Sequence, residues 1–145
     1  MKIILDVNIV IDALRPNHEF EAGAVKIFDL ASQDKIDPFI CVNSLTDIFY
    51  ILRKIHGLIK AKETIANLVI ATDIVALTKN DCIDALALQI NDFEDAIIAV
   101  CAKKINADYI VSRDEKFIKT TTDVEVISPQ NLLVKIAGAD KKVTP

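Results

Sequence analysis

The segment from Asp92 to Asp114, DFEDAIIAVCAKKINADYIVSRD, indicates how this chain folds. Apolar residues recur at helical spacing from Phe93 to Lys104, and the run ADYIVS that follows is typical of a β-strand. The helix begins beside two carboxylates, Asp92 and Asp95, and the strand ends just before a third, Asp114. This pattern predicts an α/β protein in which acidic side chains gather at one edge of a parallel sheet.

The rest of the chain continues the alternation of strands and helices. Strands are expected at KIIL, FICV, IVAL and EVI, and helices at residues 8–14, 19–34, 44–56, 58–71, 80–90 and from 129 to about 137. This order predicts a three-layer α/β/α sandwich around a mainly parallel sheet of roughly four to five strands. Since no linker divides the chain, residues 1–137 are expected to form a single domain and residues 138–145 a polar C-terminal tail.

Composition argues against several classes of protein. The net charge of −4 disfavours a broad basic surface of the kind that binds duplex nucleic acid without specificity. The three cysteines lie far apart and show no zinc or disulfide spacing, so they are expected to be buried and reduced. Acidic residues interrupt the apolar N-terminus, and no uncharged stretch is long enough to cross a bilayer. We therefore expect a cytoplasmic protein with no membrane contact.

Acidic residues occur at four separate places along the chain, each where an apolar strand ends or a helix begins. Carboxylates in apolar surroundings are costly unless they are paired, hydrogen-bonded or bound to a cation. If the strand ends and helix starts face the same sheet edge, these acids converge there. A divalent cation is the leading common explanation for the set Asp6, Asp47, Asp92, Asp95 and Asp114.

Each of these acids also has a purely structural explanation. Asp6 could be a helix N-cap, and Asp114 could be a turn aspartate. The spacing of a capping box occurs twice, at Ser44 with Asp47 and at Asp92 with Asp95. Basic residues near the acidic segments, among them Arg15 and Arg113, could steer a polyanion or could be ordinary solvated cations.

Two uncharged residues lie beside the acids. Asn8 offers an oxygen ligand or a hydrogen-bond donor close to Asp6, or else it faces solvent. Ser112 ends a predicted strand and either supports the site or is an ordinary strand-end hydroxyl. The chain has no GxGxxG, Walker or GxSxG motif, and its two histidines, His18 and His56, have no partner in a nucleophile or zinc pattern. A nucleotide-binding loop and a covalent nucleophile are therefore not indicated.

Together these motifs resemble the PIN-domain family of metal-dependent ribonucleases, which includes the VapC-type toxins of toxin–antitoxin pairs. The matching pieces are ILDVNIVIDAL, SLTDIFYILRK, the segment from Asp92 to Asp114, and VISPQNLL, and they span nearly the whole chain. The resemblance implies Mg²⁺ or Mn²⁺ as cofactor and hydrolysis of RNA phosphodiester bonds. It also implies a homodimer and a small antitoxin protein as a partner.

By resemblance, four acids take the catalytic metal-site positions of the family: Asp6, Asp47, Asp95 and Asp114. Asp92 is an additional acid beside the metal, and Asn8 and Ser112 are supporting residues. The RNA is expected to be single-stranded or looped, because such a backbone can enter a narrow acidic cleft and a stiff duplex cannot.

Two other functions stay open from the sequence. The family often has Glu where this chain has Asp47, which favours a catalytically inactive PIN-like dimerisation or interaction module. The string DVNIV differs by one residue from the DxDxV motif of haloacid-dehalogenase-like phosphatases, with Asn8 at the second acid. Because Asn8 cannot act as a general acid, the phosphatase is the weaker alternative.

Overall fold

A single five-stranded sheet forms the centre of the computed structural model, which describes residues 1–143. Its strands are β1 (Lys2–Leu5), β2 (Asp37–Cys41), β3 (Asp73–Val75), β4 (Tyr109–Val111) and β5 (Val126–Ile127). They lie in the order β3-β2-β1-β4-β5, and every pairing is parallel. The prediction of a mainly parallel sheet of this size is confirmed.

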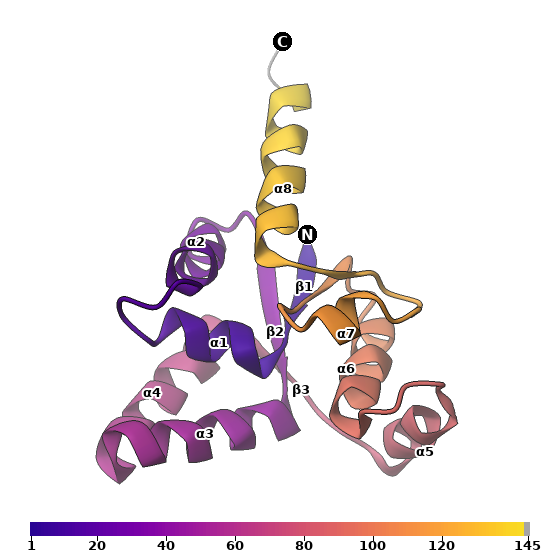
Figure 1. The fold of residues 1–145 in the computed structure, drawn as a ribbon, viewed down its shortest axis with the longest axis horizontal. Helices are drawn as coiled ribbons and strands as arrows, with labels where there is room; N and C mark the ends of the chain where they lie inside the picture. The colour runs from indigo at the N-terminus through magenta and orange to yellow at the C-terminus, as the bar shows by residue number, and fades with distance from the viewer. Residues whose placement is uncertain (144–145) are drawn as a thin grey trace.

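Helices cover both faces of this sheet. Within residues 1–143 they are α1 (Val7–Ala13), α2 (Glu21–Ser32), α3 (Val42–His56), α4 (Leu58–Ala71), α5 (Lys79–Ala87), α6 (Phe93–Lys104), α7 (Glu115–Ile118) and α8 (Pro129–Val143). Figure 1 shows α1, α2 and α4 on one side of the strands and α5 to α7 on the other, with α8 above the strands and α3 below them. Buried side chains of α3 and α8 belong to the same core as those of α1, α2 and α4. None of these helices combines the length and the apolar composition that a membrane span requires.

The central strand β1 shows why the sheet needs helices on both faces. Ile3 and Leu5 pack into a core with α1 to α4 and α8, whereas Ile4 packs into a second core with α5 and α6. Successive side chains of a strand point to opposite faces, so a wholly apolar strand must be covered twice. All three side chains are fully buried, which stabilises the fold by roughly 1.5–3 kcal/mol each. The predicted three-layer α/β/α sandwich is confirmed.

The strand order places a crevice between β1 and β4. From β1 the chain runs outward to β2 and β3, and then returns to the other side of β1 to form β4 and β5. Crossovers therefore leave β1 and β4 in opposite directions, and ligand sites in open α/β sheets lie at the carboxyl ends of such strands. Asp6 directly follows β1, and Ser112 directly follows β4.

The start of α3 differs from the prediction. This helix begins at Val42, directly after β2, and its N-cap is Cys41. Ser44 therefore lies inside the helix, where its side chain is fully buried. The predicted capping box of Ser44 with Asp47 is wrong, because strand β2 passes into the helix two residues earlier than the helical pattern indicated.

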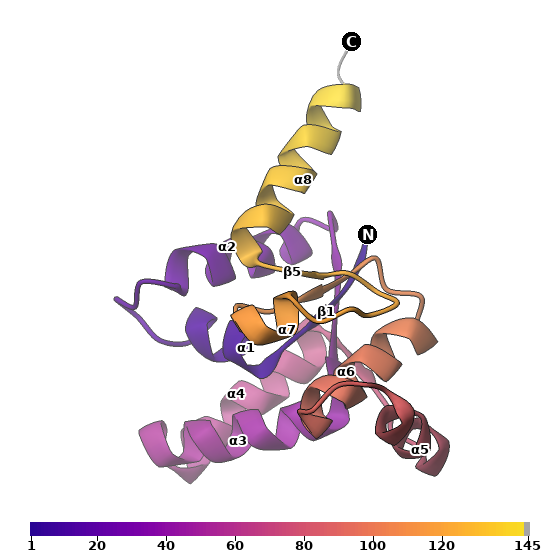
Figure 2. The same cartoon turned by 45° about the vertical axis from the view of Figure 1, so that its right-hand side comes forward.

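The final helix also differs from the prediction. It continues past Ala137 to Val143, so most of the expected polar tail is helical, and residues 144–145 of that tail lie outside the described residues. Residues 137–142 are exposed, and an exposed helix tolerates Gly138 among good helix formers. Figure 2 shows this helix projecting away from the rest of the molecule.

We propose that residues 1–137 are the folding unit, as the sequence predicts. Removing residues 138–145 is expected to lower the free energy of unfolding by less than about 1 kcal/mol, because the helix is exposed there. Leu132→Ala is expected to lower it by about 2–5 kcal/mol, because Leu132 is fully buried. Urea denaturation followed by circular dichroism measures both changes, and a loss of several kcal/mol in the truncated chain would contradict the proposal.

Candidate active site

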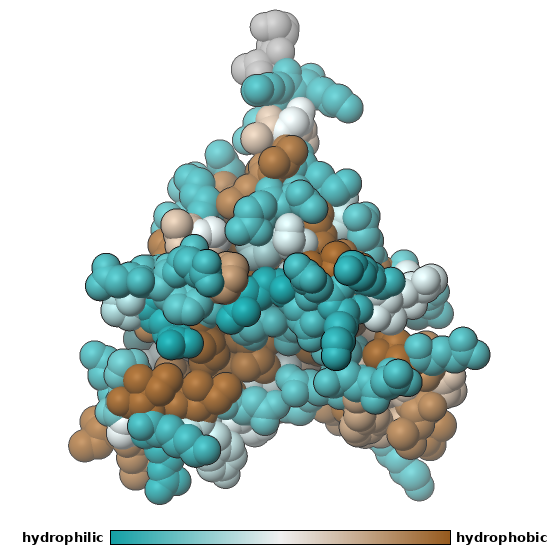
Figure 3. All heavy atoms as spheres, in the orientation of Figure 1, coloured by the Kyte–Doolittle hydropathy of each residue, from teal (hydrophilic) through white to brown (hydrophobic). Residues whose placement is uncertain are grey.

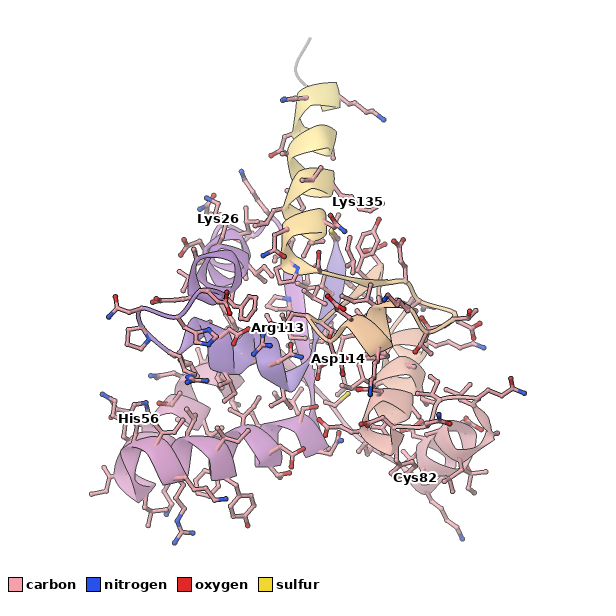
Figure 4. All side chains as sticks on the ribbon, in the orientation of Figure 1. Lys26, His56, Cys82, Arg113, Asp114 and Lys135 are labelled. Atoms are coloured by element: carbon pink, nitrogen blue, oxygen red, sulfur yellow. The ribbon has the colours of Figure 1, made fainter. Side chains whose placement is uncertain are left out.

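An open cleft of about 750 Å³ lies at the carboxyl ends of β1 and β4. Its walls come from α1, α3, the start of α6 and the segment after β4. Figure 4 shows two of the lining residues, Arg113 and Asp114, close together near the middle of the molecule. The acids along the cleft are Asp6, Asp47, Asp92, Glu94, Asp95 and Asp114. The fold thus brings together every acid that the sequence singled out, and it adds Glu94.

Asp6 is the most deeply buried of these acids, with 7% of its surface exposed. It is the N-cap of α1, where Oδ1 accepts a hydrogen bond of 2.8 Å from the backbone N–H of Val7. Ser112 donates a second bond, of 2.7 Å, to Oδ2. Burial raises the pKa of Asp6, and the negative charges of Asp114 and Asp92 add to the rise, although the two hydrogen bonds oppose it. Both carboxylate oxygens are therefore held in place.

Ser112 joins several parts of the site through one buried hydroxyl group. Besides donating to Asp6, its Oγ accepts the backbone N–H of Asp114 at 3.1 Å and the side-chain amide of Asn8 at 3.4 Å. The Oδ1 atom of Asn8 in turn accepts the backbone N–H of Arg113 at 3.4 Å. The side chains of Asn8 and Ser112 thus connect α1 to the segment after β4.

Asp92 and Asp95 lie at the start of α6. Asp92 is the N-cap, and its Oδ1 accepts the backbone N–H of Asp95 at 3.1 Å. Burial raises the pKa of Asp95 to about 7, with further contributions from the charges of Asp92, Asp6 and Asp114. These effects outweigh the helix N-terminus, which favours a negative charge. Asp95 is therefore an acid whose ionised form is unfavourable here unless a cation is close.

Asp114 is exposed and is the N-cap of the short helix α7. Its Oδ1 accepts the backbone N–H of Lys116 at 3.0 Å, while none of the described residues donates to Oδ2. The sequence did not predict α7, so the alternative of a turn aspartate becomes a helix cap. Capping occupies one oxygen and leaves the other available to a ligand, so the two roles are compatible.

Asp47 and Glu94 both line the cleft, Asp47 from α3 and Glu94 from α6. Burial raises the pKa of Glu94 to about 7, and the nearby charges of Asp47 and Asp6 raise it further. Asp47 itself is exposed. The sequence reasoning missed Glu94, although the string DFED places Asp92 at the N-cap of α6 and two more acids, Glu94 and Asp95, in its first turn.

Arg113 is the cation closest along the chain to the supporting serine. Its guanidinium binds both oxygens of Asp12, through Nε at 2.5 Å and Nη2 at 3.1 Å. Asp12 is 1% exposed, and the sequence reasoning did not include it among the site residues. Phe20 packs its ring 4.3 Å from the guanidinium carbon. The hydrogen bonds and charge of Asp12 raise the pKa of Arg113, so it stays a cation.

The chemistry of the donor set fits a hard divalent cation. Among residues 1–143, no three acidic, histidine or cysteine side chains stand close enough to hold a metal ion as they are placed. The cleft nevertheless concentrates six carboxylates against two arginines, and two of the acids have a pKa raised to about 7. Carboxylate oxygens are the ligands that Mg²⁺ and Mn²⁺ prefer. A cation would relieve this repulsion, and the exposed acids are free to turn toward it.

A larger cavity, of about 920 Å³, lies between α5, α6 and residues 120–123. Its main charges are already paired, Lys104 with Asp81 at 2.6 Å and Lys103 with Asp123 at 2.8 Å. Asp84 is the one further charge along its wall, so this cavity has a far smaller excess of negative charge than the cleft with six acids and two arginines. We therefore place the candidate site in the smaller acidic cleft.

A curated protein is similar to this chain in sequence. Ribonuclease VapC1 of Aquifex aeolicus (strain VF5) is 29% identical over 137 residues, which cover 89% of this chain and 91% of that protein. The sequence match therefore extends over nearly the full length of both proteins.

Solved structures share the fold at low sequence identity. The structure of VapBC2 from Rickettsia felis bound to a promoter DNA fragment aligns with a TM-score of 0.65 and 17% identity, covering 88% of this chain and 98% of that one. VapC20 of Mycobacterium tuberculosis, described as a toxin that cleaves the sarcin–ricin loop, aligns with a TM-score of 0.64 and 14% identity, covering 79% of this chain and 92% of that one.

The family model described as PIN domain matches residues 2–116. The chain therefore belongs to the PIN-domain family.

Proposed function

We propose that this protein is a metal-dependent endoribonuclease that hydrolyses phosphodiester bonds of single-stranded or looped RNA. The observation that carries this proposal is the convergence of acids from separate segments in one cleft, where burial and mutual repulsion raise the pKa of Asp95 to about 7. The curated relative is named a ribonuclease, and VapC20 is described as a toxin that cleaves the sarcin–ricin loop, which supports a ribonuclease activity here.

The proposed cofactor is Mg²⁺ or Mn²⁺. Its core ligands would be Asp6, Asp95 and Asp114, with Asp92 as an additional acid and Asp47 as a ligand or a base that orients water. When bound, such a cation activates water for attack and offsets negative charge on the phosphodiester.

The chain's own residues prepare the site in three ways. The hydroxyl of Ser112 fixes the orientation of the Asp6 carboxylate from a fully buried position. Backbone N–H groups fix one oxygen each of Asp92 and Asp114. Glu94, with a pKa of about 7, can hold or release a proton at neutral pH beside the other acids. Positioning of this kind lowers the cost of reorganising the site during reaction.

The two alternative functions stand differently. The side chain of Asn8 donates hydrogen bonds to Asp6 and Ser112 and accepts one from the backbone N–H of Arg113. The chain also belongs to the PIN-domain family. Both observations count against a haloacid-dehalogenase-like phosphatase. The inactive interaction module differs from our proposal only in lacking ribonuclease activity. Its support is Asp47, whose side chain is shorter than the Glu that is frequent at this position in the family. The cleavage experiment below separates the two.

We also propose that the protein is the toxin of a toxin–antitoxin pair, acts in the cytoplasm, and forms a homodimer. Structures described as VapBC complexes support a small protein antitoxin as partner. The three cysteines are free, which suits a reducing compartment. Figure 3 shows hydrophobic surface gathered at the lower left, over α3 and α4. The exposed apolar residues of these two helices include Ile55, Leu58, Ile59, Val69 and Ile70.

Asp6→Asn and Asp95→Asn are each expected to lower Mn²⁺-dependent RNA cleavage at least about 100-fold, because each removes a charge from the proposed cation site. The assay uses a panel of structured RNAs with Mn²⁺ and with EDTA, after circular dichroism confirms folding. Asp84→Asn, which changes an exposed acid outside the cleft, is the matched control. Cleavage that persists in EDTA, or in both folded variants, would refute the proposal.

Metal-free protein should lose stability as the pH rises from about 4 to about 7. The pKa of Asp95 is about 7 in the folded state against an ordinary value of 3.8, so the folded state binds more protons in this range. At pH 7.5, Asp95→Asn should be more stable than the unchanged chain by about 1 kcal/mol after solvent screening. Urea titrations in EDTA measure the difference, and equal pH profiles for the two chains would contradict it.

The homodimer proposal predicts two chains per particle in sedimentation equilibrium. The double substitution of Ile59 and Ile70 by Asp should give a monomer, because both side chains are 85% exposed on α4 and two charges would oppose burial. Ile83→Asp on α5 is the control and should remain dimeric. A monomeric unchanged chain, or a dimer that survives the double substitution, would rule out this interface.

A further inference from the structure

The acidic cleft contains a cation whose position is fixed by the protein. Arg113 lines the cleft between Ser112, which orients Asp6, and Asp114, which caps α7. Figure 4 shows Arg113 beside Asp114 in the interior of the view, between α1 and α7. A positive group at this place faces the same space as the carboxylates. It is therefore close to any substrate that enters the cleft.

Three contacts hold this guanidinium in place. Asp12 accepts two parallel hydrogen bonds from it, at 2.5 Å and 3.1 Å, and this carboxylate is 1% exposed. Phe20 lies under its plane, with the ring centre 4.3 Å from the guanidinium carbon. A planar guanidinium held by a carboxylate and a ring loses little conformational freedom when it binds a ligand. Arg15 lines the same cleft but has no carboxylate partner among the described residues.

Arg113 retains hydrogen-bonding capacity on its open side. A guanidinium carries five N–H groups, and Asp12 takes two of them. The other three have no acceptor in residues 1–143, and 36% of the side chain is exposed. The ion pair with Asp12 therefore uses only part of the hydrogen-bonding capacity of the guanidinium, and the remaining donors are available to a ligand in the cleft.

The negative charge of the cleft makes a fixed cation important for binding a polyanion. Six carboxylates line it, and a polyanion that approaches them is repelled wherever a cation does not intervene. We propose that Arg113 is a phosphate-binding residue that holds the RNA backbone in the cleft through two parallel N–H···O bonds. Asp12 and Phe20 act as its positioning residues. This inference rests on the proposed ribonuclease function and names the protein group that binds the substrate.

The test measures RNA binding separately from cleavage. The probe is a fluorescein-labelled single-stranded RNA of mixed sequence, titrated with Ca²⁺ in place of Mg²⁺ and shown by electrophoresis to stay intact. The main variant is Asp12→Asn with Arg113→Gln, which removes both charges of the pair and keeps the net charge. Its matched control is Asp123→Asn with Lys103→Gln. This variant removes an exposed ion pair, with 2.8 Å between its nitrogen and oxygen atoms, whose residues do not line the cleft.

The proposal predicts that the main variant binds RNA about 10- to 100-fold more weakly than the control, since a hydrogen bond to a charged group is lost. It also predicts that the slope of log K against log salt becomes shallower by about 0.7, the value for one phosphate contact on a single strand. A purely structural pair would change stability and leave this slope unchanged. An affinity and slope equal to those of the control would overturn the proposal.

Arg113→Lys decides the outcome if the double variant does not fold. It keeps the charge beside Asp12 but lacks the planar fork, so binding should weaken while the salt slope stays the same. Affinity equal to that of the unchanged chain would overturn the two-bond contact. If the unchanged chain neither binds nor cuts RNA, the ribonuclease function itself fails, which is distinct from unaltered binding by the variants alone.

Discussion

The hydrogen bond from Ser112 to Asp6 joins the two halves of this fold. Asp6 follows β1 and Ser112 follows β4, the neighbouring strands from which the chain turns in opposite directions. Both side chains are buried, so each needs the other as a partner in the interior. The same hydroxyl accepts hydrogen bonds from Asn8 and Asp114. The hydroxyl of Ser112 thus fixes both the carboxylate of Asp6 and the segment that carries Asp114.

Around this contact the protein accumulates more negative charge than folding alone would favour. Burial raises the pKa of Asp95 and of Glu94 to about 7, and the charges of the neighbouring carboxylates add to both rises. The acids reduce part of the cost by capping helices, as Asp92 and Asp114 do. Such strain is typical of sites whose charges are balanced by a ligand. Arg113 supplies a fixed positive charge at the same wall, held by the buried Asp12.

The sequence predicted the elements whose signal is local. Helix α6 has the predicted bounds, and the convergence of the acids followed from the rule that parallel strands place their ends at one sheet edge. What escaped prediction depends on contacts between distant segments. Arg113 and Asp12 are 101 positions apart, and no local pattern pairs them. The early start of α3, which places Ser44 inside the helix, depends on strand β2, which ends at Cys41 and passes directly into the helix.

The central claim is that the cleft acids bind a divalent cation. A crystal soaked in Mn²⁺, with an anomalous difference map recorded at the manganese absorption edge, tests it most directly. A peak within coordination distance of Asp6, Asp95 and Asp114, about 2.0–2.3 Å from their oxygens, is the result that we predict. A map with no peak in the cleft at saturating Mn²⁺, or a peak only elsewhere on the chain, would contradict the claim.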